Sequence, residues 1–266
     1  MKQRVISATI ALLLFVPILF YGGWVFEIAI LLLALQGLRE FIHIKETRKK
    51  LPDFIKFISY ILLAIMVLST AGMEEYNFNV DFRLLSAIFL SYLIPVVMYH
   101  SREKYSVNDA FYLISGIFFI GMSFNLLILI RSVSLNYMIY LFLITIITDT
   151  YAYFIGSLIG KNKLLENISP KKTWEGSIGG TIFGVLVGSV FYHVVIDATL
   201  PIYVVVLMTL FLSILGQFGD LVFSAIKRYF GKKDFSNIMP GHGGILDRLD
   251  SIIFVMLGFM FFISII

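Results

Sequence analysis

The hydrophobic residues of this chain are gathered in long runs that are separated by short polar segments. A helix that crosses a membrane needs about 20 predominantly apolar residues. The pattern therefore predicts an all-α, polytopic membrane protein with about nine transmembrane helices, over residues 5–22, 24–38, 54–72, 84–99, 109–130, 135–160, 175–197, 200–226 and 250–266. The second of these runs is short and contains Glu27, which makes it the least typical span.

The composition agrees with this pattern. Hydrophobic residues make up 59% of the chain, charged residues only 14%, and the mean hydropathy is +0.92. An ordinary soluble domain carries about 25% charged residues, so that class is excluded. The chain has no cysteine, which excludes a disulfide framework and a thiolate metal site.

The basic residues predict which side of the membrane each loop faces. With a cytoplasmic N-terminus, segments 39–53, 100–108, 161–174 and 227–249 lie in the cytoplasm. These segments, their flanks and the N-terminus hold all of the 21 lysines and arginines except Arg83 and Arg131. The positive-inside rule favours this arrangement over its inverse. The net charge of +4 thus reflects the orientation of the chain in the cell (inner) membrane. We therefore expect no binding of nucleic acid.

Polar residues are distributed unevenly between the two halves. Residues 1–140 consist of hydrophobic hairpins with basic turns, whereas polar residues enter the predicted spans from about residue 145 onward. We therefore expect an N-terminal transmembrane scaffold (1–140) and a C-terminal transmembrane catalytic region (141–266).

One predicted span carries glycines at every fourth position, at Gly176, Gly180, Gly184 and Gly188. Such a stripe lets a second helix approach closely. The partner is a helix of the same chain or, alternatively, the same helix of a second copy in a homodimer.

Two motifs before residue 175 carry candidate chemistry. Asp149 lies about 12 residues, roughly 18 Å, before the Lys161 end of its helix. An ionisable group at that depth marks a functional site unless it only holds a structural ion pair, and Tyr153 lies on the same face. Further on, Lys171 and Lys172 precede a helix that Thr173 is expected to cap. They form either an anion site or a solvated basic loop, and the motif supports both readings equally.

A denser set of charges lies near the C-terminus. Asp220, Ser224 and Lys227 follow one another at the spacing of a single helix face, with Asp220 about 10 Å below the basic rim. Asp247 and Asp250 also share a helical face, with Arg248 between them. Carboxylate oxygens of this kind suit magnesium, which completes its shell with water and substrate phosphate.

A glycine-rich turn stands between these two groups. Gly241, Gly243 and Gly244 allow positive φ and a close approach of the backbone to phosphate. His242 is expected to contact a phosphate or pyrophosphate, although it is also a candidate metal ligand.

The stretch from Ser224 to Asp250 resembles the signature of the phosphatidate cytidylyltransferases, also called CDP-diacylglycerol synthases. The matching positions are Ser224, Lys227, Arg228, Lys233, Asp234, Ser236, Pro240, His242, Gly243, Gly244, Asp247, Arg248 and Asp250. The segments D-T-Y-A-Y at Asp149 and S-P-K-K-T-W-E-G at Ser169 resemble further motifs of that family. Met239 departs from the Leu, Ile or Phe of the family but stays apolar. The resemblance covers about residues 145–256.

The resemblance implies a nucleotidyltransferase that combines CTP and phosphatidate, at the surface of membrane lipid, into CDP-diacylglycerol and pyrophosphate for phospholipid synthesis. It also implies a magnesium ion, alone or with a second cation, held by Asp220 and Asp247. The expected catalytic residues are Asp220, Lys227, Arg228, His242, Asp247 and Asp250. The expected substrate-binding residues are Asp149, Lys171, Lys172, Ser224, Lys233, Gly243, Gly244 and Arg248.

Two other functions fit parts of the sequence. A CTP-dependent polyprenol or lipid kinase has a related membrane fold, but it transfers the γ-phosphoryl group and releases CDP. A secondary transporter also carries acidic residues within its spans. Transporters tend to show broken helices in both halves, whereas the polar residues of this chain are concentrated in one.

Overall fold

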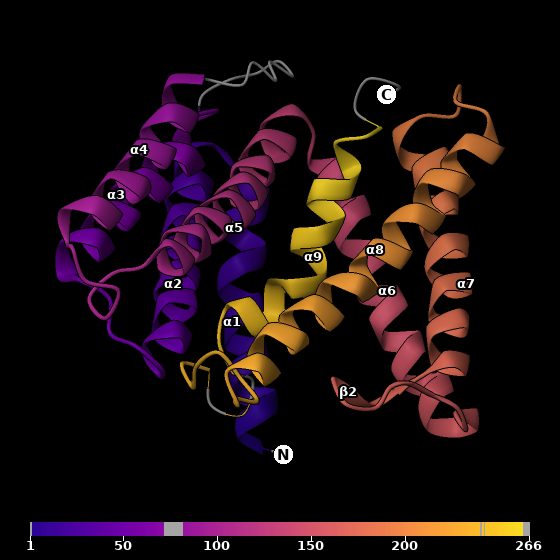
Figure 1. Ribbon diagram of the computed structural model, residues 1–266. Helices are drawn as coiled ribbons and strands as arrows, with labels where there is room; N and C mark the ends of the chain where they lie inside the picture. The colour runs from indigo at the N-terminus through magenta and orange to yellow at the C-terminus, as the bar shows by residue number, and fades with distance from the viewer. Residues whose placement is uncertain (1, 72–81, 240, 242, 263–266) are drawn as a thin grey trace. The chain divides into compact units, whose positions relative to one another are not determined.

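The computed structural model describes residues 2–71, 82–239, 241 and 243–262. Each of the nine apolar runs coincides with an α-helix in this part of the chain (Figure 1). The helices are α1 (Lys2–Tyr21), α2 (Gly23–Glu46), α3 (Asp53–Leu68), α4 (Phe82–Met98), α5 (Val107–Val133), α6 (Leu135–Ile159), α7 (Trp174–Phe191), α8 (Ile202–Tyr229) and α9 (Leu246–Phe259).

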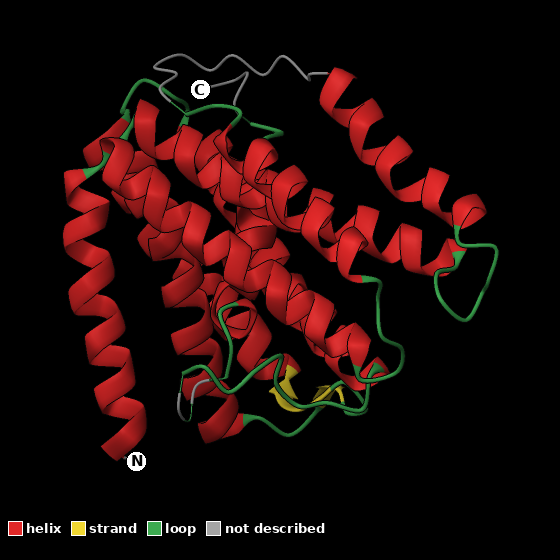
Figure 2. Ribbon diagram, turned by 90° about the vertical axis from the view of Figure 1, so that its left-hand side faces the viewer, coloured by secondary structure: helices red, strands yellow, loops and turns green. Residues whose placement is uncertain are grey.

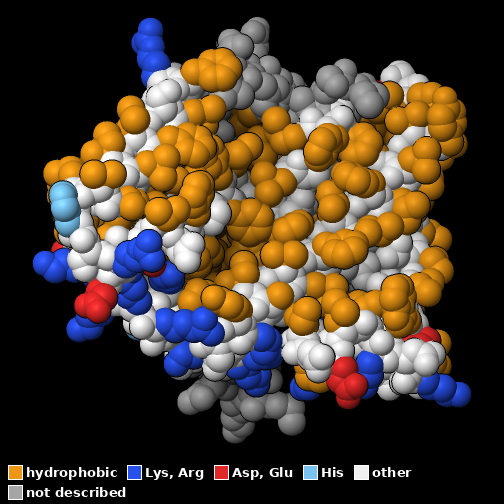
Figure 3. All heavy atoms as spheres, viewed as in Figure 1, with side chains coloured by type: hydrophobic (Ala, Val, Ile, Leu, Met, Phe, Trp, Pro, Cys, Tyr) orange, Lys and Arg blue, Asp and Glu red, His pale blue; other side chains and the backbone are white. Residues whose placement is uncertain are grey.

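Four helical segments are long and apolar enough to cross a membrane, among the residues that the structure describes. They are α5, α6, α7 with its π-helical extension Tyr192–Ile196, and α8. The segments Thr9–Tyr21 and Phe82–Met98 are apolar but shorter. Figure 3 shows hydrophobic side chains over most of the visible face of each of the two units described in the next paragraph. Lys and Arg side chains gather near one end of each unit. The chain is thus an all-α membrane protein.

The chain forms two compact units. The first comprises residues 1–133 together with Asp234–Leu246, and the second comprises Ser134–Lys233 and Asp247–Ile266. The stretch Ser224–Asp250 therefore contributes to both units: its middle, 234–246, belongs with α1–α5, and its two ends belong with α6–α9. The functional division at residue 140 into scaffold and catalytic region stays a prediction.

Two of the predicted loops contain regular structure. The segment 39–53 was expected to be a loop, but α2 continues to Glu46. The segment 161–174 forms an antiparallel hairpin of β1 (Lys163–Leu165) and β2 (Ser169–Thr173), shown in yellow in Figure 2. As predicted, Thr173 caps α7, because its hydroxyl accepts a hydrogen bond from Gly176 N at 3.2 Å.

In the first unit, α2 is fastened to α5 by aromatic and charged contacts. The rings of Phe41 and Tyr112 stack with centroids 4.3 Å apart, and the Tyr112 hydroxyl donates to Phe41 O at 2.7 Å. One turn further on, the buried carboxylate of Asp109 pairs with Lys45 Nζ at 2.9 Å and also with Lys49. These contacts hold the C-terminal half of α2 at a fixed place on α5.

In the second unit, the glycine stripe of α7 packs against α6. A β-carbon built at Gly176 would lie 2.5 Å from Ala152 O, and one built at Gly180 would lie 2.5 Å from Thr148 O. Real β-carbons do not come so close to a backbone oxygen. The stripe is therefore a contact within one chain, and the alternative of a homodimer draws no support from it.

We predict that Gly180→Ala destabilises the second unit by about 1–3 kcal/mol, because the new methyl group would meet the backbone of α6. Gly179→Ala is the matched control on the neighbouring position. Its methyl group would meet only side-chain atoms of Ile155, and the closest of them, Cδ1, can move by rotation about χ2. Alanine also favours a helix by about 1 kcal/mol over glycine, so this variant should lose less stability than Gly180→Ala. Thermal unfolding in detergent should separate the two variants; equal melting temperatures would contradict the packing described.

Candidate functional site: paired lysines and carboxylates on α8 and α9

The predicted polar face of α8 is present. Asp220, Ser224 and Lys227 all lie within this helix, and the Ser224 hydroxyl donates to Asp220 Oδ1 at 3.2 Å. Ser224 and Lys227 are buried, and Asp220 is partly exposed. Because side chains four residues apart are neighbours on a helix, this contact follows directly from the spacing.

A buried ion pair joins α8 to α9. Lys227 Nζ lies 2.6 Å from Asp247 Oδ1, and the two side chains are only 8% and 3% exposed. Asp247 stands in the first turn of α9, where the helix dipole also favours a negative charge. In surroundings with little water each charge depends strongly on the other, so the pair fixes where both groups lie.

A second ion pair joins the hairpin to α8. Lys172 Nζ lies 2.7 Å from Asp220 Oδ2, with side chains 24% and 32% exposed. Successive residues of a strand point to opposite sides, and Lys171 is accordingly exposed and directed away from this pair. The two adjacent lysines therefore have different surroundings, which the sequence motif did not distinguish.

Two more carboxylates belong to the same unit. Asp250 on α9 is buried and accepts a hydrogen bond from Ser251 N at 2.9 Å. Ser251 in turn donates its hydroxyl to Asp149 Oδ2 of α6 at 3.3 Å. The charges of Asp220 and Lys172 act on Asp149, and those of Asp220 and Lys227 act on Asp250. These four carboxylates and two lysines thus form one interacting set.

Close packing of α8 on α9 makes this set possible. A β-carbon built at Gly219, next to Asp220, would lie 2.5 Å from Asp250 O. Glycine lets the two backbones approach at this level. By contrast, Tyr153, which the sequence places on the same helix face as Asp149, does not join this buried set, since its side chain is 73% exposed.

The remaining basic residues of the motif lie at the periphery. Arg228 donates to two main-chain carbonyls, those of Lys232 at 2.9 Å and Ile168 at 3.4 Å, and so ties the hairpin to the end of α8. Lys233 and Arg248 are exposed. Their predicted roles in substrate binding need access to solvent, which this placement provides.

The glycine-rich part of the motif lies in the first unit. Gly241 and Gly243 adopt φ values of 79° and 81°, as predicted, whereas Gly244 does not have a positive φ. Gly244 is needed for a different reason: a β-carbon there would lie 2.5 Å from Glu40 Cδ. The prediction for His242 falls outside the described residues.

Glu40 is the polar residue that the sequence analysis missed. It lies in α2, is 1% exposed, and its carboxylate accepts hydrogen bonds from Ser236 and from the backbone at Ile245 and Leu246. One sign of it was present in the sequence: Glu40 is an acidic residue in a largely apolar segment, three positions after Gly37 and directly before Phe41. It was overlooked because position 40 was assigned to a loop.

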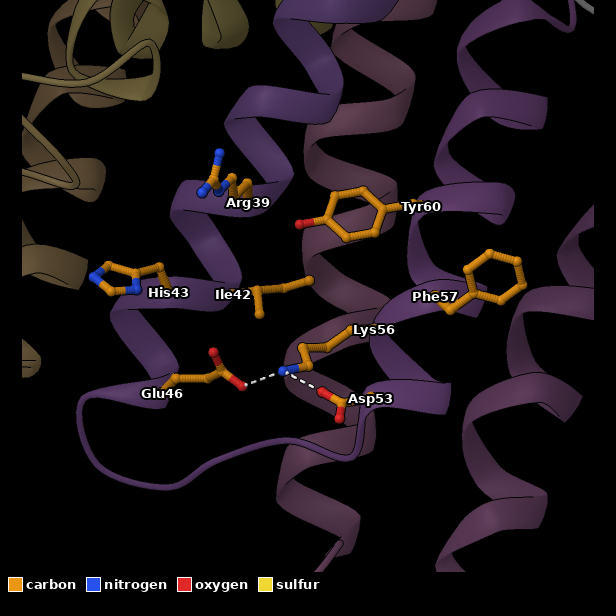
Figure 4. A pocket seen from close by; sticks show the side chains of 8 residues that line it. All are labelled: Arg39, Ile42, His43, Glu46, Asp53, Lys56, Phe57 and Tyr60. Atoms are coloured by element: carbon orange, nitrogen blue, oxygen red, sulfur yellow. Dashed lines mark hydrogen bonds and ion pairs between the residues drawn. The ribbon is translucent and has the colours of Figure 1, made fainter. Parts of the chain in front are cut away.

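The first unit also contains a pocket of about 480 Å³ between α2 and α3 (Figure 4). Its charged and polar lining comprises Arg39, His43, Glu46, Asp53, Lys56 and Tyr60. Lys56 is already paired with Glu46 at 3.0 Å and with Asp53 at 2.8 Å, as the dashed lines show. No residue of the Ser224–Asp250 motif lines this pocket, so we do not place the chemistry there.

The set in the second unit offers oxygen ligands for a hard cation. Four carboxyl groups and two ammonium groups lie together, and carboxylate oxygens are the ligands that a hard divalent cation prefers. Within the described ranges no three of the His, Asp and Glu side chains converge as a ready metal site. Magnesium is often held by only one or two carboxylates, with water and substrate phosphates as the other ligands. The donors therefore fit magnesium in the company of a phosphate substrate.

Comparison with known proteins places this arrangement in a family. The model of the cytidylyltransferase family matches residues 2–266. The chain belongs to the cytidylyltransferase family. It is 40% identical over 257 residues to the phosphatidate cytidylyltransferase of Staphylococcus haemolyticus, with 96% of each chain covered. It is 38% identical, with the same coverage, to the proteins of that name from Staphylococcus saprophyticus and Staphylococcus aureus. The resemblance seen at 145–256 thus extends over the whole chain.

We predict that Lys227→Met destabilises this cytidylyltransferase by about 3–5 kcal/mol, because it removes the cation paired with a buried carboxylate. The double variant Lys227→Met with Asp247→Asn should recover most of that loss. Chemical unfolding in detergent measures both. The control is Lys172→Met, whose partly exposed pair with Asp220 should contribute at most about 1 kcal/mol. A loss of the same size in both single variants would refute the distinction between the pairs.

Proposed function

We propose that this protein is a phosphatidate cytidylyltransferase, which transfers the cytidylyl group of CTP to phosphatidate and gives CDP-diacylglycerol and pyrophosphate. The observation that carries the proposal is the similarity, over 96% of the chain, to proteins of that name. The paired lysines and carboxylates of the second unit support it, because they supply the charges that such a reaction needs.

The chemical problem is to bring two anions together. An oxygen of the phosphatidate phosphate attacks the α-phosphorus of CTP, and the bond from that phosphorus to the oxygen that bridges to the β-phosphate breaks. Pyrophosphate carries away the electron pair of that bond. No covalent intermediate with the protein is needed, so the protein contributes orientation and neutralisation of charge.

The described side chains divide these tasks. We assign the ammonium groups of Lys172 and Lys227 to substrate phosphates, and Asp220 and Asp247 to a magnesium ion, alone or with a second cation. When bound, the ion would neutralise the phosphate oxygens and polarise the bond to the leaving pyrophosphate. Without substrate, each of these lysines stabilises the carboxylate beside it. Asp149 and Asp250 hold Ser251 between them and keep α6 and α9 in register.

We further propose that the reaction takes place at the cytoplasmic face of the cell membrane, since CTP is a cytoplasmic solute. The proposal includes nine membrane spans and a cytoplasmic N-terminus. Its support is the distribution of Lys and Arg: with the proposed topology, all but Arg83 and Arg131 lie on the cytoplasmic side, as the positive-inside rule favours. The ends of α8 and β2 that carry Lys227 and Lys172 both belong to that basic side.

Product analysis tests the proposed reaction. Purified protein is given phosphatidate and CTP labelled in the cytidine, and both lipid-extractable label and pyrophosphate are measured. We expect equal amounts of the two. A CTP-dependent lipid kinase would instead release labelled CDP and leave the lipid unlabelled. A transporter would consume no CTP, and either result would overturn the proposal.

We predict that Asp220→Asn and Asp247→Asn each lower kcat/KM by at least about 100-fold, because an ionised ligand contributes several kcal/mol to a magnesium-assisted transfer. Asparagine keeps the shape of the side chain, so membrane insertion should not change, but Asp247→Asn also breaks the buried pair with Lys227, so activity is expressed per amount of folded protein. Asp197→Asn is the control: its carboxylate accepts hydrogen bonds from Thr199 and lies away from the set. Unchanged magnesium dependence in the first two variants would remove these residues from the metal site.

A further inference from the structure

The first unit contains a buried carboxylate that the proposed reaction does not use. Glu40 is 1% exposed, and four groups donate hydrogen bonds to it. Ser236 Oγ donates at 2.7 Å, Ile245 N at 2.9 Å, Leu246 N at 3.0 Å and Gln36 Nε2 at 3.2 Å. Three of these donors belong to the loop segment 234–246, so one side chain of α2 holds both ends of that segment.

The chemistry of these contacts favours an ionised carboxylate over any neutral side chain. All four partners are donors, and a carboxylate consists only of acceptors. Two of the donors are backbone N–H groups at the start of α9, where the helix dipole favours a negative charge. Burial of an ion is costly unless such partners are present. Glu40 therefore acts as a helix cap for α9 that is supplied from a distant part of the sequence.

The fit between Glu40 and the loop is close. A β-carbon at Gly244 would lie 2.5 Å from Glu40 Cδ, and one at Gly37 would lie 3.1 Å from Leu246 Cδ2. The two glycines thus remove side chains where α2 and the loop meet. Glu40 itself is held firmly, because the Phe41–Tyr112 stack and the Lys45–Asp109 pair fasten the same part of α2 to α5.

We propose that Glu40 is a positioning residue for catalysis: it fixes the glycine-rich segment 234–246 and the first residue of α9, and thereby the place of Asp247, which directly follows Leu246. Asp247 is an assigned metal ligand, so this inference rests on the proposed function. In this proposal Glu40 is assigned to neither substrate nor metal; it acts through the segment that it holds.

Two measurements test the proposal in Glu40→Gln and Glu40→Ala. The first concerns the anchor alone. The chain has no cysteine, and Ile238 is 50% exposed, so a nitroxide on Ile238→Cys reports the mobility of the segment. We expect both variants to increase that mobility. Glutamine should do so because its amide group places donors against donors, although it keeps the shape of glutamate.

The second measurement concerns positioning. We expect the magnesium concentration for half-maximal activity to rise, and kcat/KM to fall at least about tenfold, as the loss of a hydrogen bond to a charged group implies. Glu46→Gln is the matched control: the same change, on the same helix, at a carboxylate that pairs with Lys56 and not with the loop. It should leave label mobility and magnesium dependence unchanged.

The outcomes are separable. If the label in both Glu40 variants is as immobile as in Glu46→Gln, Glu40 is not an anchor and the proposal fails. If the label becomes mobile but magnesium dependence stays unchanged, with activity falling only in proportion to the folded protein, Glu40 has a structural role and the proposal also fails. Absence of cytidylyl transfer in the parent protein would overturn the proposed function alone, since the label still reports the anchor.

Discussion

The structure depends on one constraint: a charge that is removed from water has to be matched within the protein. Apolar surroundings give an ion little of the solvation that it loses, so an unmatched buried charge costs several kcal/mol. Lys227 and Asp247 meet the constraint as an ion pair, and Asp109 meets it with two lysines. Glu40 meets it through hydrogen-bond donors only. In each case the match joins segments that are distant in sequence, so the charges also determine how the helices are held.

Charged groups of different helices can pair in this way only where the helices lie close together. Small residues allow that close approach. The carboxylates of Asp220 and Asp250 come from helices whose backbones nearly touch at Gly219. The glycine stripe of α7 does the same against α6, which carries Asp149. Dispersion contacts between closely packed helices stabilise a membrane protein in which burial from water contributes little. The glycines are thus part of the site, although they carry no chemistry.

The sequence predicted those features of the structure that depend on local periodicity. Apolar run length located the nine α-helices of the described residues, hydroxyl placement identified the Thr173 cap, and helical spacing placed Asp220 beside Ser224. It did not predict the hairpin, whose short strands carry no long alternating pattern. As a result it treated Lys171 and Lys172 as equivalent, whereas strand geometry directs only Lys172 toward Asp220. Glu40 was missed because position 40 was assigned to a loop, and because its partners on the segment 234–246 lie about 200 positions away.

This last contact changes the part assigned to the N-terminal half. The predicted site residues all lie after residue 145, which suggested that residues 1–140 serve only as a scaffold. Yet the chain leaves the second unit at Lys233, is held by α2 through residues 234–246, and returns with Asp247. Both ends of the glycine-rich segment donate hydrogen bonds to one buried carboxylate of α2, so the N-terminal half supplies a contact that holds part of the motif. The match of the cytidylyltransferase family over residues 2–266 includes both α2, which carries Glu40, and the segment that Glu40 holds.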